Sequence, residues 1–246
     1  MEIHKPKPVR NWREFLSEMS VIVLGILIAL SGEQLIETLH WRYEVRETDA
    51  RLARELGANA AVAMLRLRLA PCDEKRLDEI ASIIDAAETS GKLPPIGALG
   101  RPILYLYGHG TWDSAVASQT VTHFPVQRLQ NFAVAYQLIS RLGDLNQREL
   151  EAWNDLWVLV GPGRPFDASA AESARLATTR ARLLSRQVRG WSGNLRERVK
   201  ALNLPPHTSA RVDQLEADAR EPLSRYDICK PIGKEISPTY GQAPSL

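Results

Sequence analysis

Two cysteines are the first residues of the chain with a definite possible chemistry. Cys72 and Cys229 are the only thiols among 246 residues, which excludes a disulfide-dense scaffold and a four-cysteine zinc site. In an oxidising compartment they have one possible pairing, which would close a long loop and stabilise the fold by a few kcal/mol at most. The alternative is two unpaired thiols. A redox pair is disfavoured because the chain has no C-x-x-C motif.

A second candidate surrounds a Thr-Trp-Asp patch at residues 111–113. His109 and His123 flank this patch and could meet Trp112 and Asp113 in a pocket. The alternative is that they are polar loop residues beside a buried tryptophan. None of the five histidines has a second histidine or a cysteine three or four residues along the chain, so the sequence predicts no metal site.

No other arrangement of residues indicates catalysis. The glycine pairs Gly108/Gly110 and Gly161/Gly163 are not followed by Lys-Ser/Thr, as a phosphate-binding loop would require, and there is no G-x-S-x-G motif. Acidic residues are numerous, but we expect them on solvated helix faces. The sequence therefore predicts no catalytic residue, no cofactor and a protein that is not an enzyme.

The overall charge is nearly balanced, with 31 basic and 29 acidic residues. This balance gives no general attraction to nucleic acid, so no nucleic-acid partner is predicted. Seven arginines are nevertheless concentrated between residues 175 and 198. They could face an acidic partner or a lipid surface, or they could form the solvated face of a helix bundle.

The strongest signal is an uncharged apolar run from Met19 to Ser31. A bilayer requires about 20 mostly apolar residues, and apolar neighbours extend the run to residues 14–34. Trp12 and Trp41 lie on either side of this run, as expected for residues in the aromatic belts at the two faces of a membrane. The sequence predicts one transmembrane helix over 14–34, preceded by a cytoplasmic leader over 1–13.

Two other interpretations of this run remain open. It could be a buried core helix because its uncharged part is short, or a cleaved signal peptide because Ala29-Leu30-Ser31 resembles a small-x-small cleavage site. The leader has four basic residues against three after the span, which favours a cytoplasmic N-terminus. We therefore expect a single-pass protein of the bacterial inner membrane with most of its chain in the periplasm.

Small residues lie along the predicted transmembrane helix. Gly25 and Ala29 are four residues apart, and Gly32 follows three residues later. Such a stripe could let another membrane helix approach closely. The alternative is that small residues are simply common in membrane helices.

Two patches of the chain resemble a bacterial family of single-pass membrane proteins of unknown function. Ser17–Leu30 is similar to the opening of those proteins, which typically show a Gly-Glu pair and an apolar run ending in Gly-Ile-x-Ile-Ala-Leu. Residues 110–113, with Ser118 after them, resemble a central Thr-Trp-Asp signature. This chain has Ser17 where glycine is usual and residues 32–34 where an amide-rich stretch is usual. The resemblance implies a membrane anchor and a helical extracytoplasmic domain, without a known reaction.

The rest of the chain has the pattern of a helical bundle. Apolar residues at three- and four-residue spacing continue the membrane helix as a stalk to about Leu69, where Pro71 is expected to end it. Asp73 is the expected N-cap of the next helix, and Lys92–Gly110 is expected to be a loop. The remaining helices are predicted over residues 73–91, 111–118, 126–159, 167–202 and 208–226.

The predicted fold class is all-α, with one N-terminal transmembrane helix that continues into a stalk. A helical periplasmic domain of four to five helices would occupy residues 35–226, and an irregular tail residues 227–246. We expect a non-catalytic membrane-anchored structural or interaction protein, such as an accessory subunit of a membrane assembly. Its partners would be membrane lipid and either another protein or a second copy.

The alternative function is a periplasmic ligand-sensing domain without an output domain of its own. The loop Lys92–Gly110 and Trp112 would then line a ligand pocket. The short leader weakens this interpretation, because about a dozen residues cannot form an output domain.

Overall fold

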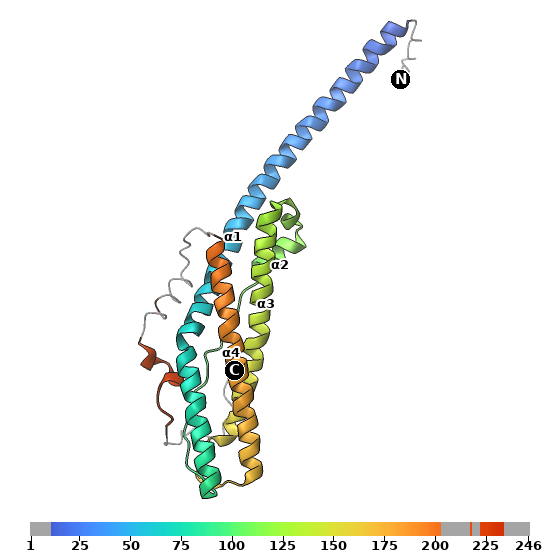
Figure 1. Ribbon diagram of the computed structural model, residues 1–246. Helices are drawn as coiled ribbons and strands as arrows, with labels where there is room; N and C mark the ends of the chain where they lie inside the picture. Colours follow the sequence, from blue (N-terminus) through green and yellow to red (C-terminus); the bar gives the residue numbers. More distant parts are fainter. Residues whose placement is uncertain (1–10, 203–216, 218–221, 234–246) are drawn as a thin grey trace, which may run out of the picture.

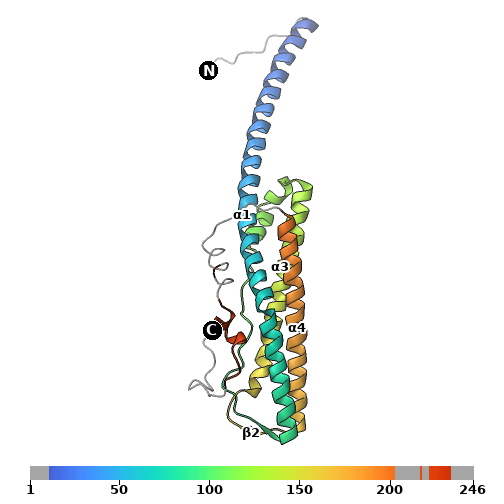
Figure 2. The same cartoon turned by 60° about the vertical axis from the view of Figure 1, so that its left-hand side comes forward.

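One helix dominates the computed structural model, which describes residues 11–202, 217 and 222–233. Helix α1 runs from Trp12 to Ser90 without interruption (Figure 1). Its 79 residues extend over about 120 Å at about 1.5 Å per residue. The N-terminal part stands clear of the rest of the molecule, whereas the C-terminal part belongs to a bundle (Figures 1 and 2).

The N-terminal part of α1 is long and apolar enough to cross a membrane. Residues 15–40 are all exposed, and large apolar side chains such as Val21 and Ile28 are 69% and 65% exposed. A soluble core helix would bury such side chains, so the interpretation as a buried core helix is wrong. The exposed apolar helix is consistent with either a membrane span or a signal sequence.

Three long helices form the bundle. The C-terminal half of α1 and helix α3 (Val126–Asp155) run in the same direction, and α4 (Ala168–Ala201) returns in the opposite direction. Helix α4 packs along both, whereas α1 and α3 contact each other at few places (Figure 1). Helix α2 (Gly110–Ala117) and the short 3-10 helix η1 (Thr120–His123) cover the bundle end nearest the apolar segment.

The buried faces of the three helices follow the seven-residue repeat of a coiled coil. Steps of four and three residues along α1 connect a continuous buried stripe: Leu52, Leu56, Asn59, Ala63, Arg66, Ala70, Asp73, Leu77, Ile80, Ile84 and Ala87. Helix α3 follows the same rule: Phe132, Ala135, Ile139, Leu142, Asn146, Glu149 and Trp153. Helix α4 does so too: Ala171, Ala174, Thr178, Ala181, Ser185, Val188, Ser192 and Leu195. This periodicity is that of knobs-into-holes packing, and the small residues of α4 let it fit closely against both neighbours.

Pro71 does not end a helix, contrary to the expectation from sequence. It lies on the exposed face of α1, where water can reach the Leu67 carbonyl that loses its backbone partner. An internal proline costs about 3 kcal/mol, and the buried stripe on both sides of Pro71 offsets that cost. The predicted separate helix over 73–91 is therefore wrong, and Asp73 lies buried inside α1 rather than at an N-cap.

The other described helices lie close to their predicted positions. The 3-10 helix η2 (Leu156–Leu159) extends α3 to the predicted end, and Asp167 caps α4 by accepting a hydrogen bond from the Ala170 amide at 2.8 Å. Helix α1 ends at Gly91, which has a φ of 68° and thus the left-handed conformation favoured by glycine.

The all-α class is confirmed. The only strands in the described residues are β1 (Lys92–Leu93) and β2 (Arg164–Pro165), which pair antiparallel and join the two loops at the far end of the bundle. Two further 3-10 helices, η3 (Leu223–Arg225) and η4 (Asp227–Cys229), follow later in the chain. Most of the predicted fifth helix over 208–226 lies outside the described residues, as do most of the leader and the tail beyond Gly233.

Replacing Pro71 with alanine should stabilise the bundle by about 1–3 kcal/mol, because alanine restores a backbone N–H and has a far higher helix propensity. Denaturant unfolding of the full chain in detergent should show a higher midpoint for Pro71→Ala. The matched control is Lys75→Ala, an exposed change in the next turn, which should move the midpoint much less. A lower midpoint for Pro71→Ala would contradict the uninterrupted helix.

Candidate functional site

Three charged side chains meet inside the bundle at positions where a coiled coil is normally apolar. Arg66 of α1 donates from Nη2 to Oε2 of Glu149 of α3 at 2.5 Å, and the same nitrogen lies 3.9 Å from Oδ2 of Asp73. All three residues are at most 3% exposed. The second carboxylate oxygen of Glu149 accepts a hydrogen bond from Ser185 of α4 at 2.7 Å. This buried polar layer therefore links all three long helices.

The polar layer has two carboxyl groups for one guanidinium group. Burial raises the pKa of Asp73 to about 7, and the attraction of Arg66 offsets only part of this shift. Burial also opposes the charge of Arg66, but attraction to Glu149 and Asp73 outweighs it and raises the pKa of Arg66. Asp73 therefore binds a proton near neutral pH while Arg66 stays charged.

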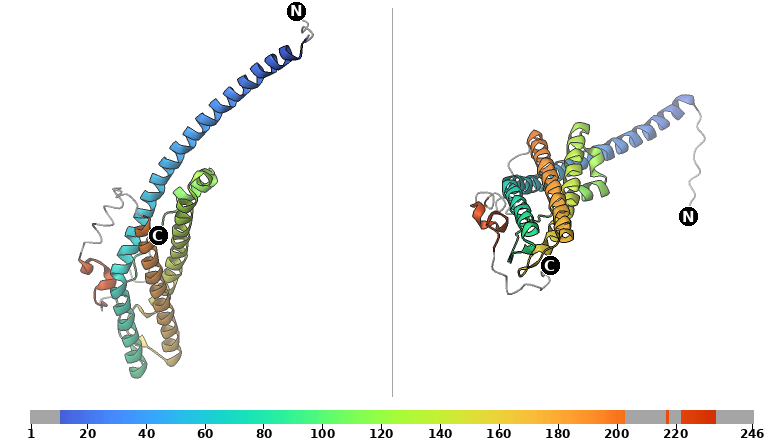
Figure 3. Two further views of the ribbon diagram at one scale, coloured as in Figure 1. Left: turned by 45° about the horizontal axis from the view of Figure 1, so that its top comes forward. Right: turned by 60° about the horizontal axis from the view of Figure 1, so that its bottom comes forward.

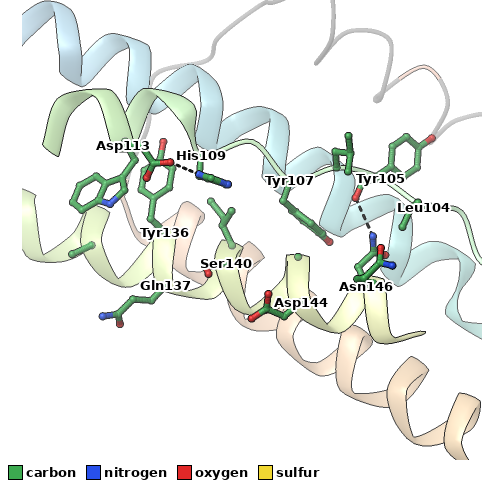
Figure 4. Close-up of a pocket in the computed structure, with 16 residues that line it drawn as sticks. Leu104, Tyr105, Tyr107, His109, Asp113, Tyr136, Gln137, Ser140, Asp144 and Asn146 are labelled. Carbon is green, nitrogen blue, oxygen red and sulfur yellow. Dashed lines mark hydrogen bonds and ion pairs between the residues drawn. The ribbon is translucent and has the colours of Figure 1, made fainter. Parts of the chain in front are cut away.

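An extended segment, Ile103–Gly108, lies between α1 and α3 (Figure 4). We name this segment the strap. Asn59 of α1 donates to the Gly108 carbonyl at 2.7 Å and accepts from the Gly108 amide at 2.9 Å. Asn146 of α3 donates to the Tyr105 carbonyl at 3.1 Å. Two buried amide side chains, one on each helix, thus hold the backbone of the strap.

These contacts explain why polar residues interrupt the apolar stripes. The Arg66 guanidinium also reaches the strap, with Nη1 3.4 Å from the Ile103 carbonyl. Backbone groups of an extended segment packed on helices have no neighbouring strand to bond with, so side chains must satisfy them. Asn59, Arg66 and Asn146 do this, and the strap occupies the place that a fourth helix would have in a four-helix bundle.

Side chains of the strap alternate between the bundle and the outside, as in a strand. Tyr105 and Tyr107 pack against the core, whereas Leu104 and Leu106 are 43% and 79% exposed. Exposed leucines on a firmly held segment form an apolar surface that is available to a partner.

The strap and α3 enclose a groove of about 530 Å³ (Figure 4). Gln137, Ser140 and Asp144 line it from one face of α3, and Tyr107 and Trp112 line the opposite wall. A cavity of this size, with aromatic walls and a few polar groups, falls within the range of ligand and peptide sites.

Three of the four residues predicted to share a pocket lie at this groove. His109, Trp112 and Asp113 all line it, and His109 Nδ1 lies 2.5 Å from Asp113 Oδ2. Trp112 stacks on Tyr136 of α3 with ring centroids 5.0 Å apart. The predicted meeting of His109 and Asp113 is therefore found in the structure.

His123 does not join them, so the expected four-residue pocket is wrong in this respect. Its ring stacks on Trp41 of α1 at a centroid distance of 3.7 Å. Helix α2 carries the chain away from the groove and over the end of the bundle, which places His123 beside the exposed part of α1.

Glu55 positions the wall of the groove that carries the Thr-Trp-Asp patch. Its carboxylate accepts from the Thr111 amide at 3.0 Å and from the Tyr136 hydroxyl at 2.7 Å. Burial and this hydrogen bond raise the pKa of Tyr136, so the tyrosine remains a donor. No pattern in the sequence distinguished Glu55 from the other acidic residues of α1.

Cys72 and Cys229 form a disulfide with Cα atoms 4.9 Å apart. Cys72 lies in the interior of α1, because Pro71 does not end the helix. The chain around Cys229 is held further by the buried Arg76, whose guanidinium donates to the carbonyls of Asp227 and Lys230. The disulfide therefore belongs to a wider contact between α1 and the C-terminal segment.

The predicted membrane-packing residues lie on one exposed face of α1. Gly25, Ala29 and Gly32 are all exposed, and a Cβ placed on either glycine would meet no other atom within 4 Å. This face is open to lipid or to another helix.

The arginine-rich face of α4 is occupied by acidic residues of α1. Arg175 pairs with Asp85 at 2.8 Å, and Arg182 and Arg186 contact Glu74 at 3.2 and 2.9 Å. These contacts lie at the solvated edge between α1 and α4. They fit the solvated-face interpretation better than a free surface for an acidic partner or lipid.

Comparisons with known proteins add nothing to this geometry. No protein-family model, no curated protein and no solved structure matches it. Within the described residues, no group of three or more His, Cys, Asp or Glu side chains is placed to hold a metal ion. The resemblance to a family of single-pass membrane proteins remains a prediction.

The raised pKa of Asp73 predicts a pH dependence of stability. Because the folded state binds this proton more tightly than the unfolded state, the stabilisation is complete below about pH 4 and is lost as pH rises through about 7. Asp73→Asn should flatten this dependence and raise the free energy of unfolding at pH 8 by at most about 4 kcal/mol. Denaturant unfolding from pH 4 to 8 measures the free energy of unfolding of both proteins. Glu151→Gln, at an exposed site on α3, is the control. If the free energy of unfolding of Asp73→Asn changed with pH as steeply as that of the unmodified chain, another titrating group would be responsible.

Removing the Asn59 side chain should loosen the strap. Asn59→Ala deletes both hydrogen bonds to Gly108 and should cost about 1–3 kcal/mol. Hydrogen exchange at Tyr105–Gly108 should become faster, while exchange in α4 should change little. Asn194→Ala, at an exposed asparagine of α4, is the matched control. Unchanged exchange in the strap would contradict its attachment through Asn59.

Proposed function

We propose that this chain is a membrane-anchored, non-catalytic interaction protein of the bacterial inner membrane. The observation that carries this proposal is the continuity of α1 from the exposed apolar segment into the core of the bundle. Since no loop separates the two parts, the helix would hold the bundle at a set distance and orientation from the bilayer. That arrangement suits a protein that presents a docking surface within a membrane assembly.

The proposed topology has the N-terminus in the cytoplasm and the bundle in the periplasm. The basic leader favours this orientation. The Cys72–Cys229 disulfide agrees with an oxidising compartment, because disulfides rarely persist in the cytoplasm. In this proposal the apolar segment is retained as an anchor in contact with lipid.

The groove beside the strap is the proposed docking place for a partner protein. Leu104 and Leu106 line its edge and are exposed, and the strap that carries them is fixed to both α1 and α3. A rigid apolar edge beside a half-open groove can receive an extended or helical segment with little ordering cost.

Ligand sensing is the second candidate function, and the polar side of the groove favours it. His109, Asp113, Gln137, Ser140 and Asp144 all converge on the same space of about 530 Å³. Several hydrogen-bonding groups around one cavity could orient a small polar molecule.

Filling the groove provides a test of both candidates. Gly143 lies in the groove wall, and a Cβ at this position meets no other atom within 4 Å, so Gly143→Trp should occupy the groove and preserve the fold. A photoreactive residue in place of Leu106 should crosslink in intact membranes to one discrete protein partner. Gly143→Trp should reduce this adduct about tenfold.

The control is the same photoreactive residue in place of Leu183, which is 56% exposed on α4 and away from the groove. Equal adducts at both sites would indicate random collisions and contradict the docking proposal. If small polar molecules instead raise the unfolding temperature and Gly143→Trp removes that effect, ligand sensing replaces docking.

A further inference from the structure

Helix α1 carries an apolar stripe outside the predicted membrane span that nothing in the described chain covers. Ile36, Leu39 and Tyr43 are 71%, 55% and 64% exposed and follow each other at steps of three and four residues. Tyr43 lies nine residues beyond position 34, or about 13 Å along the helix. This distance places Tyr43 beyond the lipid headgroups, whose layer is roughly 5–8 Å thick on each side.

The stripe points away from the bundle. At about 100° per residue, its side chains project from the face of α1 opposite to Trp41, Val45 and Thr48. Those three residues face the bundle: Trp41 stacks on His123, Val45 packs against the core and Thr48 is buried. The short helix η1 contacts this part of α1 on the face that carries Trp41, and Figure 3 shows α1 extending from there beyond the bundle. A second helix could therefore reach the stripe without displacing the bundle.

The same stripe continues into the predicted membrane span. From Tyr43, steps of four and three residues lead back through Leu39 and Ile36 to Gly32, Ala29 and Gly25. Small residues thus occupy the part of the stripe inside the membrane, where they allow close backbone approach. Larger apolar residues occupy the part outside, where their burial removes apolar surface from water. Both parts favour a helix partner along one face.

We propose that this stripe pairs with the same stripe of a second copy, so that two α1 helices form a parallel coiled coil from Gly25 to Arg46. Two copies inserted in one membrane with the same topology have parallel α1 helices, and a two-fold axis along the membrane normal brings identical residues together. The interface therefore needs no other protein.

Charge complementarity supports a second copy as the occupant. With Ile36 and Tyr43 at a positions, Arg42 is at g and Glu47 is at the following e position, the pair that meets across a parallel dimer. Arg46 takes the last d position; it is exposed, and its long side chain can carry the charge into water at the end of the coiled coil. Two-fold symmetry forms this pair twice. Glu47 has only an exposed contact of 3.7 Å with Arg51, which contributes little. No ion pair of Arg42 is found in the part of the chain that the structure describes.

This inference deepens the proposed function by naming one partner, and it rests on that proposal only for the membrane span and the topology. The groove beside the strap is lined by residues between 104 and 147, none of which belongs to the stripe. If the dimer proposal is wrong, the photoreactive residue at position 106 should still crosslink to a partner. If the docking proposal is wrong, the α1 helices should still form a dimer.

Cysteine crosslinking of the full chain in native membranes tests the proposal. The chain's own cysteines are joined to each other, so a new thiol has no internal partner. Under mild oxidation, Leu39→Cys should form a covalent dimer of twice the chain mass at least five times more efficiently than Thr38→Cys. Thr38 is exposed but points away from the stripe. Equal crosslinking at both sites, no dimer at Leu39→Cys, or an adduct with a different protein only would overturn the proposal.

Charge reversal tests the register. In proteoliposomes, energy transfer between labelled copies should show that Arg42→Glu or Glu47→Arg alone weakens dimerisation about threefold to tenfold, since each replaces two attractions by two repulsions. The double variant should restore it to within twofold of the unmodified chain. Arg148→Glu, an exposed site on α3, should have no effect. Additive losses in the double variant would overturn the proposed register and the second copy as occupant.

Discussion

A shared seven-residue repeat is the constraint on which the rest of this structure depends. Each long helix buries a stripe at alternating steps of three and four residues, and α4 fits between α1 and α3 because its stripe consists mainly of alanine, serine and threonine. The repeat also accounts for the length of α1. Buried positions continue on both sides of Pro71, so the packing of apolar residues such as Leu69 and Leu77 against the bundle outweighs the local preference of proline to end a helix.

The interruptions of the repeat are as informative as the repeat itself. Asn59, Arg66 and Asn146 occupy core positions, yet each forms a hydrogen bond with the backbone of the strap. The polar layer of Arg66, Asp73 and Glu149 reduces stability relative to an apolar core of the same volume, because burying charges is costly. Arg66 of this layer also donates to the Ile103 carbonyl at 3.4 Å, which connects the layer to the strap.

Much of the fold could be predicted from the sequence, because it follows from local patterns. The all-α class, the helix end at Gly91 and the starts of α3 and α4 depend on apolar spacing and on residues with strong positional preferences. Pro71 misled the prediction, since its local cost is visible in sequence and the compensating tertiary packing is not. Glu149 has a signal that was not used: it occupies the apolar stripe of α3 between Asn146 and Trp153, where a solvated carboxylate is not expected.

The site was less predictable than the fold, because it depends on how distant segments meet. Spacing along the chain placed His109, Trp112 and Asp113 together, since they share one turn at the start of α2. It could not place His123, whose position depends on the path of the chain over the end of the bundle. Glu55 was also missed, since its role depends on two hydrogen bonds to residues more than 50 positions away.

The position of the disulfide divides the molecule mechanically. The bond joins the middle of α1 to the segment around residue 229, so the strap, α2, α3 and α4 all lie inside one covalent ring, and the N-terminal part of α1 lies outside it. Force applied between the apolar segment and the residues after Cys229 would be transmitted along α1 to Cys72 and then through the disulfide bond. Tension on that path would bypass the groove and its walls, which would keep their shape while the anchor is strained.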